Sequence, residues 1–328
     1  MIAVSTGCPA GVGPEVSVAA AARLGKPCVL VGDSATLLLA AERVGVSRDR
    51  LVPFARRAKK GQIHLLHVGP ALGPADRRPG RPSRRSGAAQ LAYVDVAYGL
   101  VEAGVCSALV TGPVSKAAIA RSGAPGARGF RGHTEHLAER AGAPHAVMCF
   151  ASRELVTSLV TTHLPLARVP KAITRSGVAR AAVALADLLA ALGVRAPHIA
   201  VCSLNPHAGE GELLGTEERT AIVPGIRSAA RSLGRRARLC GPLGAESAYR
   251  KARAGDFDGV VAMYHDQATI PLKLVSFGDA VNVTMGLGVV RTSVDHGTAY
   301  DIAWQGRADP SGMQSAMRLA LSIRQRPR

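Results

Sequence analysis

The chain has 328 residues, of which 47% are hydrophobic and 20% charged, enough for two globular domains or one large α/β unit. No apolar run reaches the length of a membrane-spanning helix, about 18 uncharged residues, and the N-terminus lacks a basic region followed by a long apolar stretch. We therefore expect a cytoplasmic protein. The six cysteines form no CxxC pair, and several lie in apolar strand-like runs, so we expect buried, reduced thiols.

The net charge of +18 comes from 41 Lys and Arg residues against 23 Asp and Glu residues. Nucleic-acid binding would favour aromatic stacking platforms, but aromatic residues make up only 3% of the chain. We interpret the basic residues as solvated faces that also attract an anionic small substrate, with no nucleic-acid or membrane partner. The basic residues are concentrated in four segments, ARRAKK (55–60), ADRRPGRPSRR (75–85), RSLGRRARL (231–239) and RQRPR (324–328).

Short apolar runs alternate with helical patterns along the chain. The apolar runs predict strands at 2–6, 27–32, 63–68, 107–112, 145–152, 155–162, 198–204, 258–264, 280–286 and 289–294. Helical periodicity predicts helices at 34–45, 87–104, 177–193, 217–234 and 311–325. This alternation indicates an α/β fold with a mainly parallel sheet. Residues 74–86 have no periodicity and indicate a surface loop, and the absence of a long linker favours interleaved domains.

Three of the apolar runs lead into a histidine. His163 follows LVTT, His207 follows CSLNP, and His265 follows VVAMY. The C-terminal ends of parallel strands lie along one edge of a sheet, where ligands bind. Each histidine alone is typical of a hydrogen-bonded loop residue, but three matched positions favour a Zn or other divalent-metal site. The neighbouring Asp266 and Glu210 are either solvated loop charges or groups that orient the ligands or transfer protons.

Two turns that contain glycine follow strands. TGCPAGVGPE (6–15) follows the first strand and opens a helix near Pro14, without the G-x-G-x-x-G spacing of the dinucleotide fingerprint. TGPVSK (111–116) places Lys116 at the start of another helix. This lysine is either an exposed surface residue or a contact for an anion.

Polar residues also gather at a predicted helix start and near later strand ends. RGHTEHLAER (131–140) carries His133 and Thr134 at a helix start, where Thr134 is also a good N-cap, and we interpret His136 as structural. Lys273 and Arg291 follow in the last quarter of the chain. An Arg and a Lys beside a metal site suit a phosphorylated or carboxylated substrate, although solvated charges near strand ends are the alternative.

Seven segments, in chain order and over nearly the whole chain, resemble motifs of the 4-hydroxythreonine-4-phosphate dehydrogenase family. They are TGCPAGVGPE, TGPVSK, GHTEHLAE, THLPLARVP, LNPHAGEGELLGTEE, YHDQATIPLK and GLGVVRTSVDHGTAYDIA. That family is similar in fold to the isocitrate and isopropylmalate dehydrogenases, which bind NAD without a Rossmann fingerprint. The resemblance implies two interleaved α/β/α domains with a cleft between them. We expect residues 1–128 with 275–328 in the first domain, and 129–274 in a second domain with the metal ligands and dimer interface.

The resemblance also implies roles for individual residues. His163, His207 and His265 would bind one divalent metal (Zn, Mg, Mn or Co), two from one subunit and the third from its partner, which implies a homodimer with a shared active site. Lys273 and Asp266 would be catalytic. The substrate-binding positions would be His133, Thr134, Lys273, Asn282 and Arg291.

The segment DHGTAYDIA resembles the nucleotide loop of the isocitrate-type enzymes. It implies contacts to the adenosine end of NAD, or of NADP in its place. The residues concerned are Asp295, His296, Gly297, Thr298, Ala299 and Asp301.

The reaction implied by the resemblance is oxidation of the secondary alcohol of 4-hydroxythreonine 4-phosphate by NAD, followed by loss of carbon dioxide, in pyridoxal 5'-phosphate biosynthesis. The chain departs from the family pattern at Cys8, where Asp is usual, and at Ser115, where Asn is usual. These departures leave two alternatives. One is a threonate or erythronate 4-phosphate dehydrogenase with the same mechanism, and the other is a non-catalytic nucleotide-binding homologue.

Overall fold

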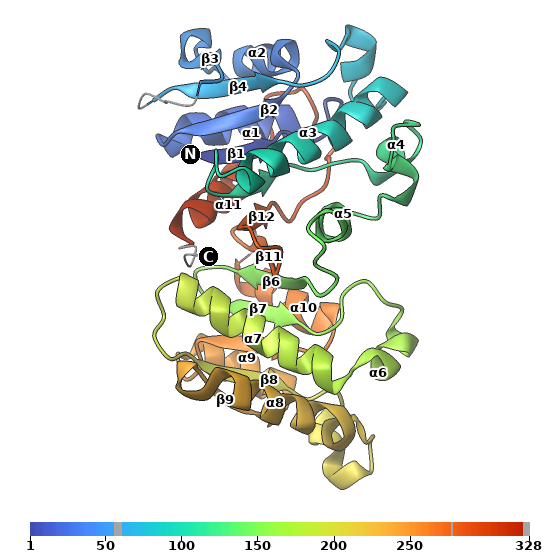
Figure 1. Ribbon diagram of the computed structural model, residues 1–328, viewed down its shortest axis with the longest axis vertical. Helices are drawn as coiled ribbons and strands as arrows, with labels where there is room; N and C mark the ends of the chain where they lie inside the picture. Colours follow the sequence, from blue (N-terminus) through green and yellow to red (C-terminus); the bar gives the residue numbers. More distant parts are fainter. Residues whose placement is uncertain (56–60, 277, 324–328) are drawn as a thin grey trace. The chain divides into compact units, whose positions relative to one another are not determined.

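The computed structural model describes residues 1–55, 61–276 and 278–323 (Figure 1). Within these residues the chain forms two compact units. Unit 1 comprises Met1–Pro144 and Leu287–Ser322, and unit 2 comprises His145–Gly286. Among the described helices, none has the length and apolar character needed to cross a membrane.

Unit 1 contains a parallel sheet in the order β3-β4-β2-β1-β5-β12. Its strands are β1 (Ile2–Ser5), β2 (Cys28–Gly32), β3 (Leu51–Pro53), β4 (Ile63–His67), β5 (Leu109–Thr111) and β12 (Arg291–Ser293). Its helices are α1 (Gly13–Leu24), α2 (Ser34–Arg43), α3 (Arg84–Glu102), α4 (Lys116–Ala120), α5 (His133–Arg140) and α11 (Ser311–Ser322). Helix α1 packs against α2 and α11, and α3 packs across β1 and β2 and against α4.

Unit 2 contains a mixed sheet in the order β11-β6-β7-β10-β8-β9, in which β6 runs antiparallel to both its neighbours. Its strands are β6 (Val147–Ala151), β7 (Val156–Leu159), β8 (His198–Cys202), β9 (Arg238–Leu243), β10 (Gly259–Ala262) and β11 (Val281–Met285). Its helices are α6 (Val169–Ala172), α7 (Arg175–Ala191), α8 (Val223–Leu233), α9 (Ala245–Arg253) and α10 (His265–Ser276). Helices α7 and α8 pack together, whereas α9 and α10 enclose a core with Phe150, Tyr249 and Leu272.

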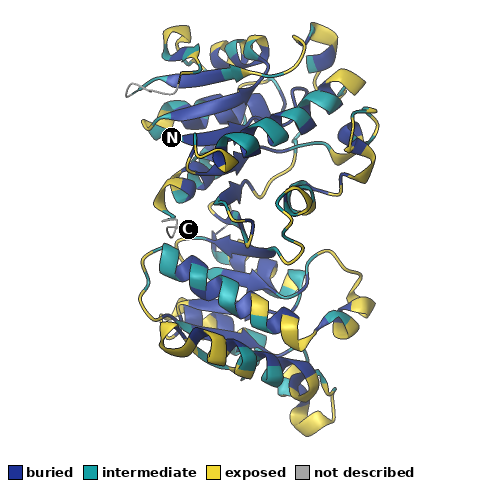
Figure 2. Ribbon diagram, in the orientation of Figure 1, coloured by how far each residue is buried: buried dark blue, intermediate teal, exposed yellow. Residues whose placement is uncertain are grey.

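Most strands of both sheets are buried, while the helices are exposed on their outer sides (Figure 2). Every residue of β2 and β10 is buried. Sheets covered by helices on both faces need continuous apolar strands, which explains why these segments read as unbroken hydrophobic runs. The prediction of an α/β fold with a mainly parallel sheet is therefore confirmed.

Each predicted strand is present, within the predicted range, but several elements were not expected from the sequence, among them the short helix α6. Strand β3 has three residues, and β9 contains a Gly-Pro pair that is typical of a turn. Helix α9 is short and rich in charge, and α10 carries Pro271 in its interior. The helix predicted at 217–234 begins as a π-turn, η6 (Glu218–Ile222), before α8.

Some predictions fall outside the described residues. These are the last two residues of the helix predicted at 311–325, most of the basic segment 55–60, and the basic segment 324–328. The loop predicted at 74–86 contains a short 3-10 turn, η2 (Pro74–Arg77), and the start of α3.

The observed units divide at other positions than the predicted domains, which end after residues 128 and 274. Residues 129–144 belong to unit 1, where Arg291 donates a hydrogen bond to the Thr134 hydroxyl at 3.3 Å. Residues 275–286 belong to unit 2 because β11 pairs with β6 along its whole length.

Candidate active site

Each of three adjacent parallel strands of unit 2 is followed by a histidine. We call His163, His207 and His265 the histidine edge. Strand β10 lies between β7 and β8 and pairs in parallel with both. His265 begins α10 just after β10, while His163 and His207 lie in the segments that follow β7 and β8. The histidines therefore follow the C-terminal ends of three adjacent strands, where ligands of parallel sheets usually bind.

His163 and His265 lie close together in the chain. Their ring centroids are 5.6 Å apart, with 41° between the ring planes. Two imidazoles that share a tetrahedral metal at the usual Zn–N distance of about 2.0 Å have ring centres about 5 Å apart. The spacing therefore fits two ligands of one metal ion.

Asp266 fixes the orientation of the His265 ring. Its Oδ1 lies 2.7 Å from Nδ1 of His265, which leaves the opposite ring nitrogen, Nε2, for a metal. A carboxylate that holds the far nitrogen of a metal-binding histidine sets its tautomer and raises its basicity. This contact suits a role for Asp266 in orienting the His265 ring.

His207 does not join the other two histidines within the chain. It is exposed and starts a left-handed turn, with φ of 51°, and positive φ continues through Glu212. Such backbone is uncommon for residues other than glycine. Among the described residues, no group of three or more His, Cys, Asp or Glu side chains could hold a metal ion.

Two polar side chains, the buried Glu218 and the half-buried Gln267, support the histidine edge. Glu218, in η6, accepts hydrogen bonds from the backbone N–H and the side-chain amide of Asn205, at 2.8 and 2.9 Å. Gln267 accepts from the Met263 N–H at 2.6 Å and donates to the Ser203 carbonyl at 2.9 Å. Gln267 ties the segment after β10 to the segment after β8, and Glu218 ties the latter segment to η6. Both residues lie within the quoted motifs LNPHAGEGELLGTEE and YHDQATIPLK, but the sequence patterns gave neither of them a role.

Lys273 and Asn282 lie elsewhere in unit 2. Lys273 is exposed on α10, eight residues after His265, which is about 12 Å along a helix axis. Asn282 is half-buried in β11.

Unit 1 holds a second concentration of predicted residues, centred on Arg291. This side chain is only 2% exposed, and its guanidinium donates to the Thr111 hydroxyl at 2.7 Å and to the Thr134 hydroxyl at 3.3 Å. Burial lowers the pKa of Arg291 to about 10, although the nearby Glu135 carboxylate acts in the opposite direction. The guanidinium is therefore still charged at neutral pH.

His133 begins α5 beside this guanidinium. Burial, followed by the positive charges of Arg291, His136 and Lys116, holds the pKa of His133 well below its usual value. Its buried Nε2 has no hydrogen-bond partner among the described residues. The imidazole is therefore neutral, with one nitrogen available to a ligand.

Lys116 completes this cluster. A Cβ placed on Gly132 would lie 3.4 Å from the Lys116 ammonium and 2.7 Å from a carboxylate oxygen of Glu135, so both side chains lie close to the start of α5. We call Arg291, Thr134, His133 and Lys116 the anion group. Two cationic side chains, a hydroxyl and a neutral imidazole suit a phosphate or carboxylate.

The predicted nucleotide loop packs against the first glycine-containing turn. The Val12 N–H donates to the Thr298 carbonyl at 3.0 Å, and a Cβ on Gly11 would lie 2.7 Å from the same oxygen. Nδ1 of His296 lies 2.9 Å from the Gly297 carbonyl. The close approach explains Gly11 of TGCPAGVGPE without a phosphate-binding role for this residue.

Comparison with known proteins decides the family. Residues 24–320 match the family model described as "Pyridoxal phosphate biosynthetic protein PdxA". The chain belongs to this family. A 4-hydroxythreonine-4-phosphate dehydrogenase from Acidithiobacillus ferrooxidans is 42% identical over 98% of this chain and 95% of its own. The one from Desulfosudis oleivorans is 39% identical, with the same coverage of both chains. The crystal structure of the Klebsiella pneumoniae dehydrogenase is 33% identical, covers 98% of this chain and 99% of its own, and has a TM-score of 0.84.

The two departures from the motifs of this family meet at one hydroxyl. The Tyr300 hydroxyl lies 3.6 Å from the Cys8 sulfur and also hydrogen-bonds the side chains of Ser115 and Thr298. Burial raises the pKa of Tyr300 to about 12, so the phenol stays protonated at neutral pH. Cys8 and Ser115 are therefore one local change rather than two, because both surround the same phenol.

Proposed function

We propose that the chain oxidises 4-hydroxythreonine 4-phosphate with NAD and releases carbon dioxide, giving 3-amino-2-oxopropyl phosphate for pyridoxal 5'-phosphate biosynthesis in the cytoplasm. The observation that carries this proposal is the pairing of His163 with His265, in a chain 42% identical to a dehydrogenase of that name. NADP in place of NAD would use the same chemistry.

A divalent metal (Zn, Mg, Mn or Co) would be held by the histidine edge. The 5.6 Å spacing of the His163 and His265 rings and the Asp266 contact to His265 fit two such ligands. When bound there, a divalent metal supplies Lewis acidity for a substrate hydroxyl.

His207 would complete the ligand set from the partner subunit of a homodimer. This proposal is supported by the separation of His207 from the other two histidines and by exposed apolar side chains nearby in the sequence. Ile270 and Leu274 lie on one face of α10 and are 66% and 84% exposed, and Leu213 is 83% exposed. Large exposed apolar side chains are typical of a surface that a partner covers.

The side chains of this chain would divide the remaining work. The anion group would bind the phosphate and carboxylate ends of the substrate, with Asn282 of β11 as a further contact. Lys273 would transfer a proton. Asp295, His296, Gly297, Thr298, Ala299 and Asp301 would contact the adenosine end of the cofactor.

The test is an assay of NADH formation with purified enzyme and added divalent metal. We expect turnover of 4-hydroxythreonine 4-phosphate well above that of threonate and erythronate 4-phosphates, tested in parallel. Faster oxidation of either sugar acid would assign the chain to the alternative dehydrogenase. No turnover of any of the three would contradict the proposed reaction.

A further inference from the structure

A pocket of about 860 Å³ lies in unit 1, and one of its three wall segments, residues 303–305, follows the predicted nucleotide loop in the sequence. Its walls include Leu39 and Arg43 of α2, Arg77 and Pro79 of the segment before α3, and Trp304. Small-molecule sites in proteins usually have volumes of about 300–1,000 Å³. The pocket is therefore large enough for a ligand such as a mononucleotide.

The indole of Trp304 is held rigidly in the wall of this pocket. Its Nε1 donates to the Pro9 carbonyl at 2.9 Å, and the Trp304 backbone N–H donates to the buried carboxylate of Glu15 at 2.6 Å. The backbone of Trp304 has a φ of 63°, which a bulky residue rarely adopts. Such strain persists only where the surroundings enforce it, and it is commonest at functional sites. The pocket thus presents a preorganised aromatic surface.

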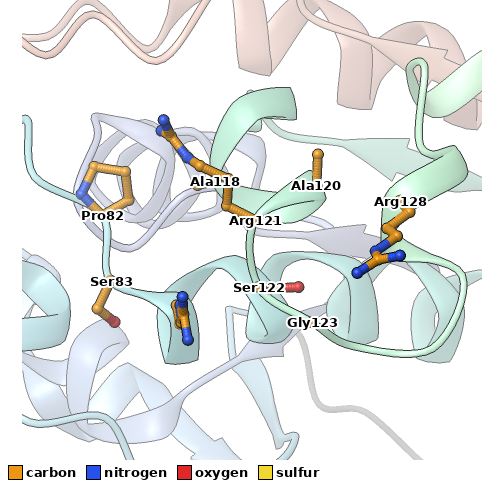
Figure 3. A pocket seen from close by; sticks show the side chains of 9 residues that line it. Pro82, Ser83, Ala118, Ala120, Arg121, Ser122, Gly123 and Arg128 are labelled. Atoms are coloured by element: carbon orange, nitrogen blue, oxygen red, sulfur yellow. The ribbon is translucent and has the colours of Figure 1, made fainter.

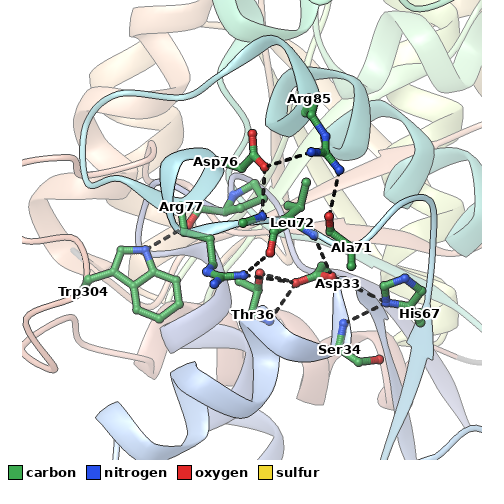
Figure 4. Close-up of polar contacts among 12 residues, drawn as sticks. Asp33, Ser34, Thr36, His67, Ala71, Leu72, Asp76, Arg77, Arg85 and Trp304 are labelled. Atoms are coloured by element: carbon green, nitrogen blue, oxygen red, sulfur yellow. Dashed lines mark hydrogen bonds and ion pairs between the residues drawn. The ribbon is translucent and has the colours of Figure 1, made fainter.

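The charges around the pocket leave one cation in excess. Glu42 is paired with Arg48, and Arg77 lies 3.8 Å from the buried carboxylate of Asp33 (Figure 4). Arg43, in contrast, has no side-chain hydrogen bond or ion pair with any residue that the structure describes. A guanidinium that has no carboxylate partner beside an aromatic surface can bind phosphate.

We propose that this pocket binds the adenosine phosphate part of a nucleotide, with the base against the indole of Trp304 and a phosphate on Arg43. Purines stack on aromatic side chains, and the apolar walls of Leu39 and Pro79 suit a flat base. The nucleotide is either the adenosine half of the nicotinamide cofactor or a free mononucleotide. The first source rests on the proposed function, and the second does not.

Trp304 is the only tryptophan in the chain, so its fluorescence reports on this pocket alone. The probe is ADP, with excitation at the red edge of tryptophan absorption, where adenine does not absorb. We expect saturable quenching by ADP and none by ribose 5-phosphate at equal ionic strength. Absence of saturable quenching, together with absence of ADP binding by calorimetry, would overturn the proposal.

Variants separate the site from general charge attraction. Arg43→Ala should weaken ADP binding about tenfold, the loss of one charge-assisted contact. The matched control is Arg121→Ala, since Arg121 is an exposed arginine of the same unit that lines a different pocket (Figure 3). Equal weakening by both substitutions would contradict the proposal.

Calorimetry with ADP tests the aromatic surface. Trp304→Phe keeps a ring and should change affinity less than threefold, whereas Trp304→Ala should weaken binding about tenfold. Unchanged thermal unfolding of Arg43→Ala would show that its effect on binding is not a folding defect. ADP affinity that is the same in Trp304→Ala as in wild type would exclude stacking on this residue.

Competition with NAD identifies the source of the nucleotide. Displacement of ADP by NAD would assign the pocket to the cofactor, and simultaneous binding would assign it to a separate mononucleotide. Turnover with NAD but no ADP binding would refute this inference and leave the proposed function standing. ADP binding without turnover would support this inference and contradict the proposed function.

Discussion

Arg291 in unit 1 is 2% exposed and held by two threonine hydroxyls, whereas His207 in unit 2 is exposed on a left-handed turn. The anion group is complete within one chain, but the histidine edge unites only two of its three members. A buried guanidinium must be fixed by hydrogen bonds before any ligand arrives, because an unsatisfied buried charge is costly. Exposed imidazoles are hydrated and carry no such requirement, so a metal site made of them can be completed when two subunits associate.

The largest expected effect comes from removing a member of the His163–His265 pair. His265→Ala should lower kcat/KM about 1,000-fold, since loss of metal-assisted charge stabilisation is worth about 4 kcal/mol. Unfolding should be unchanged, because the site is exposed. His145→Ala, also in unit 2, serves as the control and should retain activity. Substantial turnover by His265→Ala would refute the metal assignment.

Mixing inactive variants tests whether the histidine edge is completed by a partner. With His163 and His265 in one subunit and His207 from the other, a mixed dimer of His207→Ala and His265→Ala chains holds one intact site. Activity should recover to about a quarter of wild type, since about half of the dimers are mixed. The control is a mixture of His163→Ala and His265→Ala chains, which should stay inactive. Recovery in the control, with none in the first mixture, would reverse this assignment.

The orienting role of Asp266 predicts a smaller loss. Asp266→Asn keeps the shape but removes the charge beside Nδ1 of His265, and should weaken metal affinity about 10–100-fold. Titration of metal-free enzyme with Zn measures this directly. Saturating metal should restore much of the activity. A variant that binds metal normally but fails to turn over would give Asp266 a direct role in proton transfer instead.

The smallest expected effect concerns His133 of the anion group, and it is an effect of pH on the free energy of unfolding. Because the pKa of His133 is lowered in the folded state, the unfolded chain takes up a proton as pH falls through about 6.5 and the folded chain does not. Stability from this group is thus fully present above that pH and lost below it, by about 1.4 kcal/mol per pH unit. In urea unfolding at pH 7 and pH 5.5, His133→Gln should lose less stability than wild type. Equal losses would mean that His133 titrates normally.

The sequence by itself determined the strands and the positions of their histidines. Unbroken apolar runs such as 28–32 and 259–262 are typical of strands covered on both faces, and a histidine after such a strand lies near the edge of the sheet where ligands bind. The motifs likewise singled out His133, Thr134 and Arg291. Periodicity failed for β9 and α10, where Gly-Pro and an interior proline contradict the local structure that packing enforces.

Only the tertiary structure decided which of these residues meet. Thr111 and Arg291 lie 180 residues apart, and their contact exists because β5 and β12 are neighbours in the sheet. His163 lies beside His265 because β7 and β10 pair, while the left-handed turn carries His207 elsewhere. Residue patterns record local burial and backbone preference, but strand order depends on long-range packing free energy, which no local pattern contains.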